Sequence, residues 1–386
     1  MTVGGETQGQ QSTTTGWPWR PGNEFRLLHE NAEFFARMLA AIGAARQYVL
    51  LEMYLVASGA LTTRFIAAFV AARARGVRVC LLLDGFGALG LKRPDRRRLT
   101  EAGVELRIFN PLRFGGGFAN LLRDHRKLLL VDGRVAFVGG AGLTPEFDPD
   151  NPAGPWREVM VQIAGPVVCD WQRAFARTWR RSGPPLELPD PERTAAATPG
   201  ALGRLSLSEA RQRSVLANGV LRRIDAATTR VWIMSAYFVP SRRFRKALRR
   251  SARRGVEVCL LLPGAHTDHP WVRQAARRYY AKLLRNGVHI YEYAPRMLHA
   301  KMILCDEWLS VGSSNLDRWS FRWNLEANQE IADAGVAAAA AALFRGDFAA
   351  SEAISRRRWR ERARLDRLRE RIAGALDQLL DRWRHP

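Results

Sequence analysis

The stretch HRKLLLVD at residues 125–132 decides the fold, because its spacing of His, Lys and Asp recurs in HAKMILCD at residues 299–306. The apolar run after each Lys predicts a β-strand. Alternate residues of a strand share a face, so we expect the His and Lys side chains to project together. The Asp then falls at a turn: Asp132 before a Gly is a strong hairpin signal, and Asp306 before a Glu is a weaker one. An imidazole beside a fixed ammonium suits a phosphate group, and two copies make the signal strong.

The sequence before each motif is repeated as well. RGVRVCLLL at residues 75–83 is nearly identical to RGVEVCLLL at residues 254–262, and GVELR at residues 103–107 matches GVHIY at residues 287–291. Such self-similarity indicates two copies of one structural unit. Strand and helix patterns alternate in each copy. They predict an α/β fold of two pseudo-symmetric α/β/α sandwich halves with parallel-rich sheets and the active site at their junction.

The residue patterns divide the chain into five segments. They are a disordered tail at 1–22, a first half at 23–182, a Pro-rich linker at 183–204, a second half at 205–350 and a basic amphipathic C-terminal helix at 351–386. Within the first half we expect helices at 31–42, 62–75 and 95–102 and strands at 48–54, 77–84 and 104–109. The last segment carries an apolar stripe among arginines, which favours either packing against the body or contact with an anionic membrane.

The chain has 386 residues and a formal net charge of +23. Such a field favours polyanions, either nucleic acid or an anionic membrane surface. Only five of the 60 basic residues are lysines, and this arginine excess is typical of a codon preference rather than of a selected binding surface. Two of the five lysines, Lys127 and Lys301, stand in the motifs, which indicates that a compact ammonium is required there.

The composition argues against several classes of protein. No apolar run approaches the length of a membrane span, and the polar N-terminus lacks the pattern of a signal peptide, so we expect cytoplasmic residence. The four cysteines have no C-x-x-C spacing and are expected to be buried thiols. The run HTDH at residues 266–269 is a weak metal candidate, because it lies in a loop directly before a proline. We therefore expect no metal and no cofactor.

Two histidines that face each other fit displacement at a phosphodiester. This reaction needs a nucleophile on one side of phosphorus and a proton donor for the leaving oxygen on the other, and one His in each half supplies both. The two motif lysines would then hold the non-bridging phosphate oxygens.

The paired motifs resemble those of the phospholipase D superfamily, over residues 30 to 359 of this chain. Within the superfamily the sequence is most similar to bacterial cardiolipin synthases, and to the shorter, peripheral type without transmembrane helices. The resemblance is carried by DHRK at 124–127 with Gly139 and Gly140 after it, WRE at 156–158, SAYFVP at 235–240, GSSNLD at 312–317 and NLEAN at 324–328.

The resemblance implies a covalent phosphohistidine intermediate that forms without a metal. By analogy His125 is the nucleophile, and His299 is the general acid and then the general base. The symmetry of the two motifs leaves the reverse assignment open. Lys127 and Lys301 are expected to bind the phosphate oxygens.

Four residues downstream of the motifs are assigned from the same resemblance. Asn315 and Ser313 would contact the phosphate or support the residues that do. Glu326 would orient His125, and Glu158 would orient His299. The sequence departs from the family pattern at Gly142, where Asn is usual, and Glu158 stands where Asp is frequent. The motif acids Asp132 and Asp306 are interpreted as mainly structural, because the turn after each strand points them away from the histidines.

The resemblance implies a peripheral enzyme on the cytoplasmic face of the bacterial cell membrane. It would make cardiolipin or a related phospholipid from phosphatidylglycerol or a similar lipid at an anionic phospholipid surface. Two alternatives stay open, a hydrolytic phospholipase D and, less favoured, a nucleic-acid phosphodiesterase. The glycine-rich loops at 85–91 and 114–118 follow predicted strands, and they either enter a bilayer or serve as ordinary connections. The oligomeric state is left open.

Overall fold

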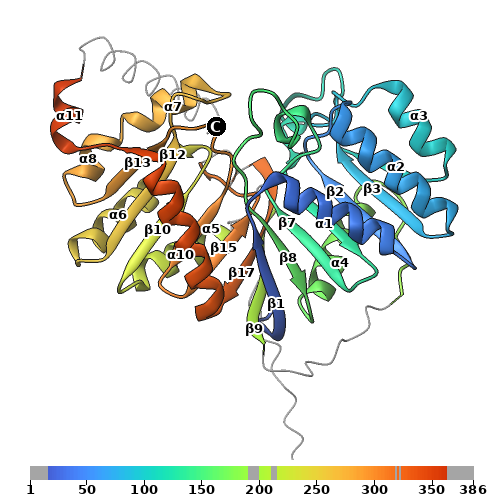
Figure 1. Cartoon of the computed structure of the whole chain (residues 1–386), viewed down its shortest axis with the longest axis horizontal. Helices are drawn as coiled ribbons and strands as arrows, with labels where there is room; N and C mark the ends of the chain where they lie inside the picture. Colours follow the sequence, from blue (N-terminus) through green and yellow to red (C-terminus); the bar gives the residue numbers. More distant parts are fainter. Residues whose placement is uncertain (1–15, 190–199, 210–214, 318–319, 321–322, 363–386) are drawn as a thin grey trace, which may run out of the picture.

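The computed structural model describes residues 16–189, 200–209, 215–317, 320 and 323–362. These residues form two lobes on one continuous sheet (Figure 1). The strands of the first half are β1 (Arg20–Leu28), β2 (Tyr48–Met53), β3 (Arg78–Asp84), β4 (Glu105–Phe109), β5 (Arg123–Asp124), β6 (Lys127–Val131), β7 (Val135–Gly139) and β8 (Met160–Ala164). Its helices are α1 (Asn31–Ala44), α2 (Ala60–Ala74), α3 (Arg93–Glu101), α4 (Val168–Arg180) and the short 3-10 turns η1 (Gly117–Leu121) and η2 (Pro145–Phe147).

The second half replays this order of elements. Its strands are β9 (Ala201–Ser208), β10 (Arg230–Met234), β11 (Phe238–Val239), β12 (Glu257–Pro263), β13 (His289–Tyr293), β14 (Met302–Cys305), β15 (Trp308–Gly312), β16 (Leu316–Asp317), β17 (Asn324–Ala332) and β18 (Ser351–Ala353). Its helices are α5 (Val215–Ala226), α6 (Arg242–Arg253), α7 (Pro270–Arg277), α8 (Tyr280–Leu284), α10 (Ala334–Ala349) and α11 (Arg356–Glu361).

The order of strands in the sheet shows the duplication directly. From the centre outward the first half runs β1-β8-β7-β6-β2-β3-β4, and the second runs β9-β17-β15-β14-β10-β12-β13 with β18 at its edge. The two series match strand for strand, and β1 pairs with β9 where they meet. Within each matching series the outer three strands are parallel to one another, and the other neighbouring strands pair antiparallel. The sheets that we expected to be parallel-rich are therefore mixed.

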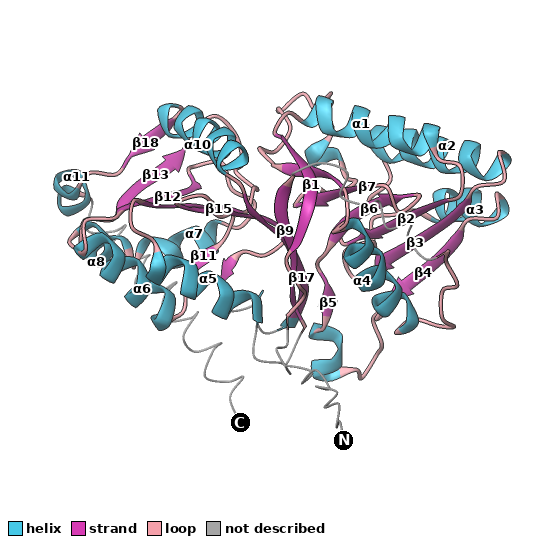
Figure 2. Ribbon diagram, turned by 90° about the horizontal axis from the view of Figure 1, so that it is seen from below, coloured by secondary structure: helices cyan, strands magenta, loops and turns pink. Residues whose placement is uncertain are grey.

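Helices cover both faces of the sheet (Figure 2). Helices α1 and α2 pack on one face of the first half, whereas α5 and α6, their counterparts, pack on the opposite face of the second half. Helices α4 and α10 contribute Trp171 and Phe344 to a hydrophobic core that spans both halves and includes Leu298, next to His299. The exchange of faces is what a pseudo-two-fold relation between the halves produces, and it brings the two motifs together.

The motif acids stabilise the hairpin turns, which lie at the opposite end of the sheet from the histidines. Asp132 and Asp306 adopt positive φ angles of 53° and 51° between the paired strands β6 and β7 and between β14 and β15. The Asp132 carboxylate accepts hydrogen bonds from the backbone N–H groups of residues 46, 47 and 48, and that of Asp306 accepts them from residues 228, 229 and 230. These contacts tie each hairpin to the start of β2 or β10 and support a structural role for both acids.

Three segment boundaries differ from the prediction. Strand β1 begins at Arg20, inside the predicted tail 1–22, because its guanidinium bonds Asp170 at 2.8 Å and its backbone pairs with β9. Strand β9 begins inside the predicted linker 183–204, because it pairs with β17 and β1. Residues 351–353 form β18 against β13 and not part of a C-terminal helix. Most of the predicted apolar stripe, and residues 1–15, lie outside the described residues.

Candidate active site

The sequence had suggested that each motif histidine lies within a strand. In the structure each lies just before one. Strand β6 begins at Lys127 and β14 begins at Met302, so His125 and His299 precede their strands. Because β6 and β14 run antiparallel to β2 and β10, both histidines lie at the end of the sheet that is formed by the C-terminal ends of β2 and β10. Backbone outside the regular ladder can take a direction that a strand cannot, which here turns each histidine toward the other half.

Backbone hydrogen bonds between the halves fix both histidines. The His125 N–H donates to the carbonyl of Leu325 at 3.0 Å, and the His299 N–H donates to the carbonyl of Arg157 at 2.9 Å. The short strand β5, just before His125, pairs with β17 of the other half, next to which it lies in Figure 2. The site is therefore built jointly by the two halves.

The carboxylates cross between the halves in the same way. The Nδ1 atom of His125 lies 3.0 Å from Oε2 of Glu326, and Nδ1 of His299 lies 2.7 Å from Oε2 of Glu158. Both glutamates are fully buried. Each pairing is the one expected from the resemblance. A carboxylate at Nδ1 fixes the orientation of each ring. It leaves Nε2 of His125 for a reacting group, whereas Nε2 of His299 lies 3.1 Å from the Lys301 ammonium.

Two buried lysines stand against the histidines, in different positions. The Lys127 ammonium donates to the carbonyl of His125 at 2.6 Å and lies 5.1 Å from the ring centre of Tyr54. The Lys301 ammonium donates to the carbonyl of His299 and also lies 2.9 Å from the Nδ1 atom of that ring. Burial lowers the pKa of Lys127 to about 7 and that of Lys301 to about 8, with Glu326 and Glu158 respectively opposing the effect.

The site disfavours positive charge on both imidazoles. Burial lowers the pKa of His125, against the opposing effect of Glu326. Burial lowers the pKa of His299 further, and Lys301, Lys127 and His125 act in the same direction. These mutual effects show that the two His-Lys pairs converge on one place. Neutral rings between two ammonium groups form a receptor for a single anionic group such as a phosphodiester.

The turn after the second motif supports the Glu326 carboxylate, the partner of His125. The Ser313 hydroxyl donates to Glu326 at 2.5 Å, and the Asn324 amide donates to the other oxygen of the same carboxylate at 3.1 Å. Asn315 is buried, and its side-chain oxygen accepts from the backbone N–H of Tyr237 at 3.4 Å. Ser313 is thus a support for Glu326, and Asn315 keeps its amide NH2 as a donor for a bound anion.

The corresponding turn of the first half has glycines at these positions, for a steric reason. A Cβ on Gly140 would lie 2.4 Å from Oε2 of Glu158, and a Cβ on Gly142 would lie 2.7 Å from Cβ of Leu55. The backbone of this turn is held there, because the Leu143 N–H donates to the carbonyl of Leu55 at 2.9 Å. The unusual Gly142 therefore follows from close packing, and an Asn side chain has no room there.

Aromatic side chains that sequence reasoning did not assign line the site. The rings of Tyr54 and His125 are 4.7 Å apart, and those of Phe147 and Trp156 are each 5.2 Å from His299. Tyr237 lies 6.4 Å from His299. Tyr54 follows β2 and Tyr237 follows the matching strand β10 closely. That shared position is a sequence signal which could have identified them.

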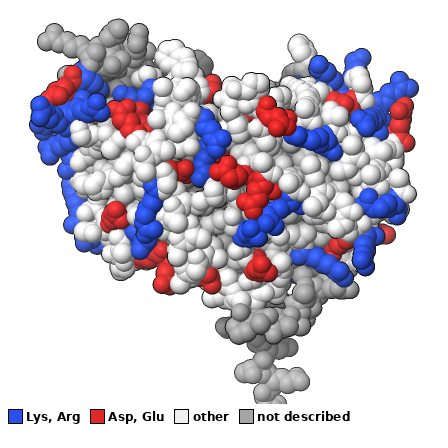
Figure 3. All heavy atoms as spheres, in the orientation of Figure 1, with Lys and Arg blue, Asp and Glu red and all other residues white. Residues whose placement is uncertain are grey.

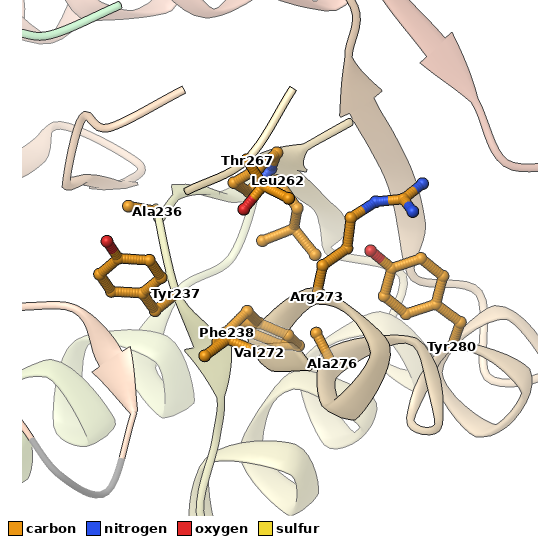
Figure 4. A pocket seen from close by; sticks show the side chains of 10 residues that line it. Ala236, Tyr237, Phe238, Leu262, Thr267, Val272, Arg273, Ala276 and Tyr280 are labelled. Carbon is orange, nitrogen blue, oxygen red and sulfur yellow. The ribbon is translucent and has the colours of Figure 1, made fainter. Parts of the chain in front are cut away.

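Behind Tyr237 lies a small pocket in the second half, with room for about one water molecule (Figure 4). Its lining is mostly apolar, with Phe238 and Val272 below Tyr237, Leu262 above them beside Thr267, and the Arg273 side chain on the far side. The pocket contains none of the motif histidines or lysines. It therefore adjoins the two His-Lys pairs, through Tyr237, without including them.

The weak metal candidate at residues 266–269 has a different contact. Asp268 accepts a hydrogen bond from the Tyr237 hydroxyl at 2.5 Å, and burial raises the pKa of Tyr237. Within the described part of the chain, no three His, Cys, Asp or Glu residues come close enough together to hold a metal ion. In the same part of the chain, no helix combines the length and apolarity needed to cross a bilayer.

Comparisons with known proteins agree with this geometry. Residues 38–179 and 220–348 match the family model described as cardiolipin synthase, phospholipase D-like domain. The chain is 35% identical over 376 residues to cardiolipin synthase A of Pseudomonas aeruginosa strain LESB58, covering 95% of this chain and 75% of the relative. It is 35% identical over 328 residues to cardiolipin synthase B of Escherichia coli K12, covering 82% and 78%. In fold it is similar to a phosphatidylserine synthase of Haemophilus influenzae, with a TM-score of 0.72, 10% identity and coverage of 92% and 93%.

Proposed function

This chain belongs to the phospholipase D superfamily, in its family of cardiolipin synthases with a phospholipase D-like domain, and on that basis we propose that it transfers a phosphatidyl group between phospholipids. The donor is phosphatidylglycerol or a similar lipid. The acceptor is the headgroup hydroxyl of a second phosphatidylglycerol, and the products are cardiolipin and glycerol. The observation that carries the proposal is the crossed arrangement of the two halves, in which each motif histidine is paired with a buried carboxylate of the other half.

The first step forms a phosphohistidine. With Nδ1–H directed at Glu326, His125 presents an unprotonated Nε2 to the phosphorus of the donor. A bond forms between Nε2 and phosphorus while the bond from phosphorus to the glycerol oxygen breaks. His299 enters this step with a proton on Nε2, a form that the bound phosphodiester anion stabilises, and it donates that proton to the leaving oxygen. Lys127, Lys301 and Asn315 hold the non-bridging oxygens, on which negative charge gathers.

The second step reverses the first with a new alcohol. His299 takes the proton of the acceptor hydroxyl, whose oxygen attacks phosphorus, and the bond from phosphorus to His125 breaks. Water must be excluded from the site for transfer to the acceptor hydroxyl to prevail over hydrolysis. The aromatic side chains around His299, Phe147 and Trp156, support this exclusion because they cover the ring from the solvent.

We place the enzyme at the cytoplasmic face of the bacterial cell membrane, where its lipid substrates lie, with an anionic phospholipid surface as its partner. The distribution of charge supports this over a nucleic-acid partner. On the face drawn in Figure 3, acidic side chains are interspersed among the basic ones over both lobes. A nucleic-acid backbone instead favours a continuous basic track.

The test is incubation of the purified full-length chain with vesicles of labelled phosphatidylglycerol, followed by lipid chromatography. Cardiolipin together with free glycerol is expected. Phosphatidic acid as the sole lipid product would replace the transferase by a hydrolytic phospholipase D. No lipid turnover, combined with cleavage of DNA, would overturn the proposal in favour of a nucleic-acid phosphodiesterase.

A further inference from the structure

The exposed apolar side chains of this protein are gathered in one region. Among the described residues, seven large hydrophobic side chains are exposed, by 43% to 112%, and six of them lie on connections that follow strands β3, β4 and β12. These six, called the rim from here on, are Phe86, Leu89, Leu112, Phe114, Phe118 and Trp271. The seventh, Leu202, lies on the central strand β9.

The rim lies at the same end of the strands as the active site. Strands β3 and β4 run parallel to β2, and β12 runs parallel to β10. The connections after them therefore leave the sheet at the strand ends where both histidines lie. On one side, Phe118 stacks on Trp323 with ring centres 6.3 Å apart, directly before the strand that carries Glu326. On the other, Trp271 stands three residues after Asp268, the partner of the Tyr237 hydroxyl. The rim therefore has members from both halves beside the site.

The chemistry of the rim fits a bilayer. The Phe114 side chain is fully exposed at 112%, and Phe118, Leu89 and Phe86 are exposed at 61%, 60% and 52%. Patches of this kind mark surfaces that meet an apolar partner. Exposed basic side chains flank them, namely Lys92, Arg93 and Arg113. Aromatic side chains beside cations suit the interface of an anionic bilayer, where rings enter the acyl region and cations meet the phosphates.

Charge argues against a second copy of this chain as the occupant. With a formal net charge of +23, two copies repel each other, whereas an anionic lipid surface attracts each of them. The buried site gives a further argument. His125 and His299 are only 8% and 2% exposed, so a lipid phosphate has to leave the interface to reach them while its acyl chains stay in apolar surroundings.

We propose that the rim enters the bilayer and holds the active-site mouth against the lipid headgroups. The inference rests on the proposed function for its choice of partner. It adds a defined contact surface, made by loops of both halves, to a site that the motifs alone describe only in chemical terms. Insertion of the rim directs both His-Lys pairs toward the membrane, so donor and acceptor lipids can enter from the same leaflet.

The experiment compares the full-length chain with two variants in vesicle sedimentation. Vesicles contain equal parts of phosphatidylglycerol and phosphatidylcholine. The rim variant combines Phe86→Ser and Phe114→Ser, and the matched control is Leu202→Ser, which removes an exposed apolar side chain away from the rim. We expect the rim variant to bind vesicles about tenfold more weakly than the parent and the control to bind like the parent. Both variants should turn over a dispersed short-chain phosphatidylglycerol within about twofold of the parent, because no contact with the catalytic groups is removed.

Equal vesicle binding by the rim variant and the parent would overturn the inference. So would a rim variant whose only change is a smaller molecular mass in solution, since the rim would then be a contact between protein copies. Failure of the proposed function gives a different result. In that case vesicle binding depends on the rim as expected, but the parent turns over neither vesicle nor dispersed phospholipid.

Discussion

The two halves of this molecule have the same strand order and the same His-Lys motif, but they differ in the turn that follows the motif hairpin. The second half has Ser313 and Asn315 in this turn, where Ser313 bonds Glu326 and Asn315 offers an amide to the site. The first half has Gly140 and Gly142 at these places, pressed against Glu158 and Leu55. Both halves thus keep the His-Lys pair, while the residues of the turn that follows it differ.

A second difference concerns the lysines. Among the described residues, the Lys127 ammonium is hydrogen-bonded only to the backbone carbonyl of His125, whereas Lys301 also lies against the ring of His299. Burial lowers the pKa of both histidines, and that of His299 more strongly, because Lys301 adds to the effect there whereas Glu326 opposes it at His125. The ring of His125 instead contacts the carboxylate of Glu326, which supports our proposal of His125 as the nucleophile. Pseudo-symmetric scaffolds can therefore carry chemically unequal halves.

The largest expected effect is the loss of either histidine. His125→Ala and His299→Ala should each lower turnover of phosphatidylglycerol by roughly 10⁴-fold or more, because each removes a group that forms or breaks a bond to the reacting atoms. Thermal unfolding followed by circular dichroism should show that both variants fold. Full activity in either variant would contradict a mechanism with two histidines.

Removal of the orienting carboxylates should have a smaller effect. Glu326→Gln and Glu158→Gln should each lower turnover by about 10³-fold, since the neutral amide no longer stabilises the ring orientation and tautomer. Substrate KM should change little in both. A variant that lost substrate binding but kept its maximal rate would show that the carboxylate acts on the phosphate and not through its histidine.

Exchange of the unequal turn residues probes the asymmetry itself. Asn315→Gly should lower kcat/KM by roughly 10- to 100-fold, because one donor to an anionic group is lost. Gly142→Asn should not add a matching donor. It should lower the free energy of unfolding by roughly 1–3 kcal/mol, because its Cβ meets Leu55. If Gly142→Asn were as stable as the parent in thermal denaturation, the steric account of this turn would be wrong.

The two lysines predict opposite trends in activity and stability with pH. Phosphate binding weakens as Lys127 and Lys301 lose their protons near pH 7 and 8, so kcat/KM should fall at alkaline pH. The unfolded chain binds more protons than the folded one between the lowered values and the ordinary lysine pKa of 10.5, so stability should rise with pH in that window.

Thermal unfolding of the parent and Lys127→Met at several pH values checks this. The increase in stability should be smaller in Lys127→Met than in the parent. The exposed Lys246 supplies the control, since Lys246→Met should behave like the parent. A parent protein whose stability falls steadily from pH 7 to pH 10 would contradict the buried, partly neutral lysines.

Much of this arrangement was predictable from the sequence. The repeats predicted the duplicated α/β architecture, and the motif resemblance predicted that Glu326 and Glu158 cross to the opposite histidines. The predicted strands placed the histidines inside regular structure, however, because an apolar run carries no signal for the point where pairing with β17 takes over. The tight contact at Gly142 depends on packing against Leu55, which residue spacing does not encode. The roles of the site residues and the lipid substrate stay predictions.

The most direct test of the unequal halves is to locate the covalent phosphate by peptide mass spectrometry. The donor is a p-nitrophenyl phosphodiester, whose leaving group needs no proton, and the protein is the His299→Ala variant, which lacks the base for the second step. After an alkaline quench the account predicts an adduct on His125 that accumulates with time, and no adduct in His125→Ala. An adduct on His299 in the His125→Ala variant, with none on His125 in His299→Ala, would contradict the assignment.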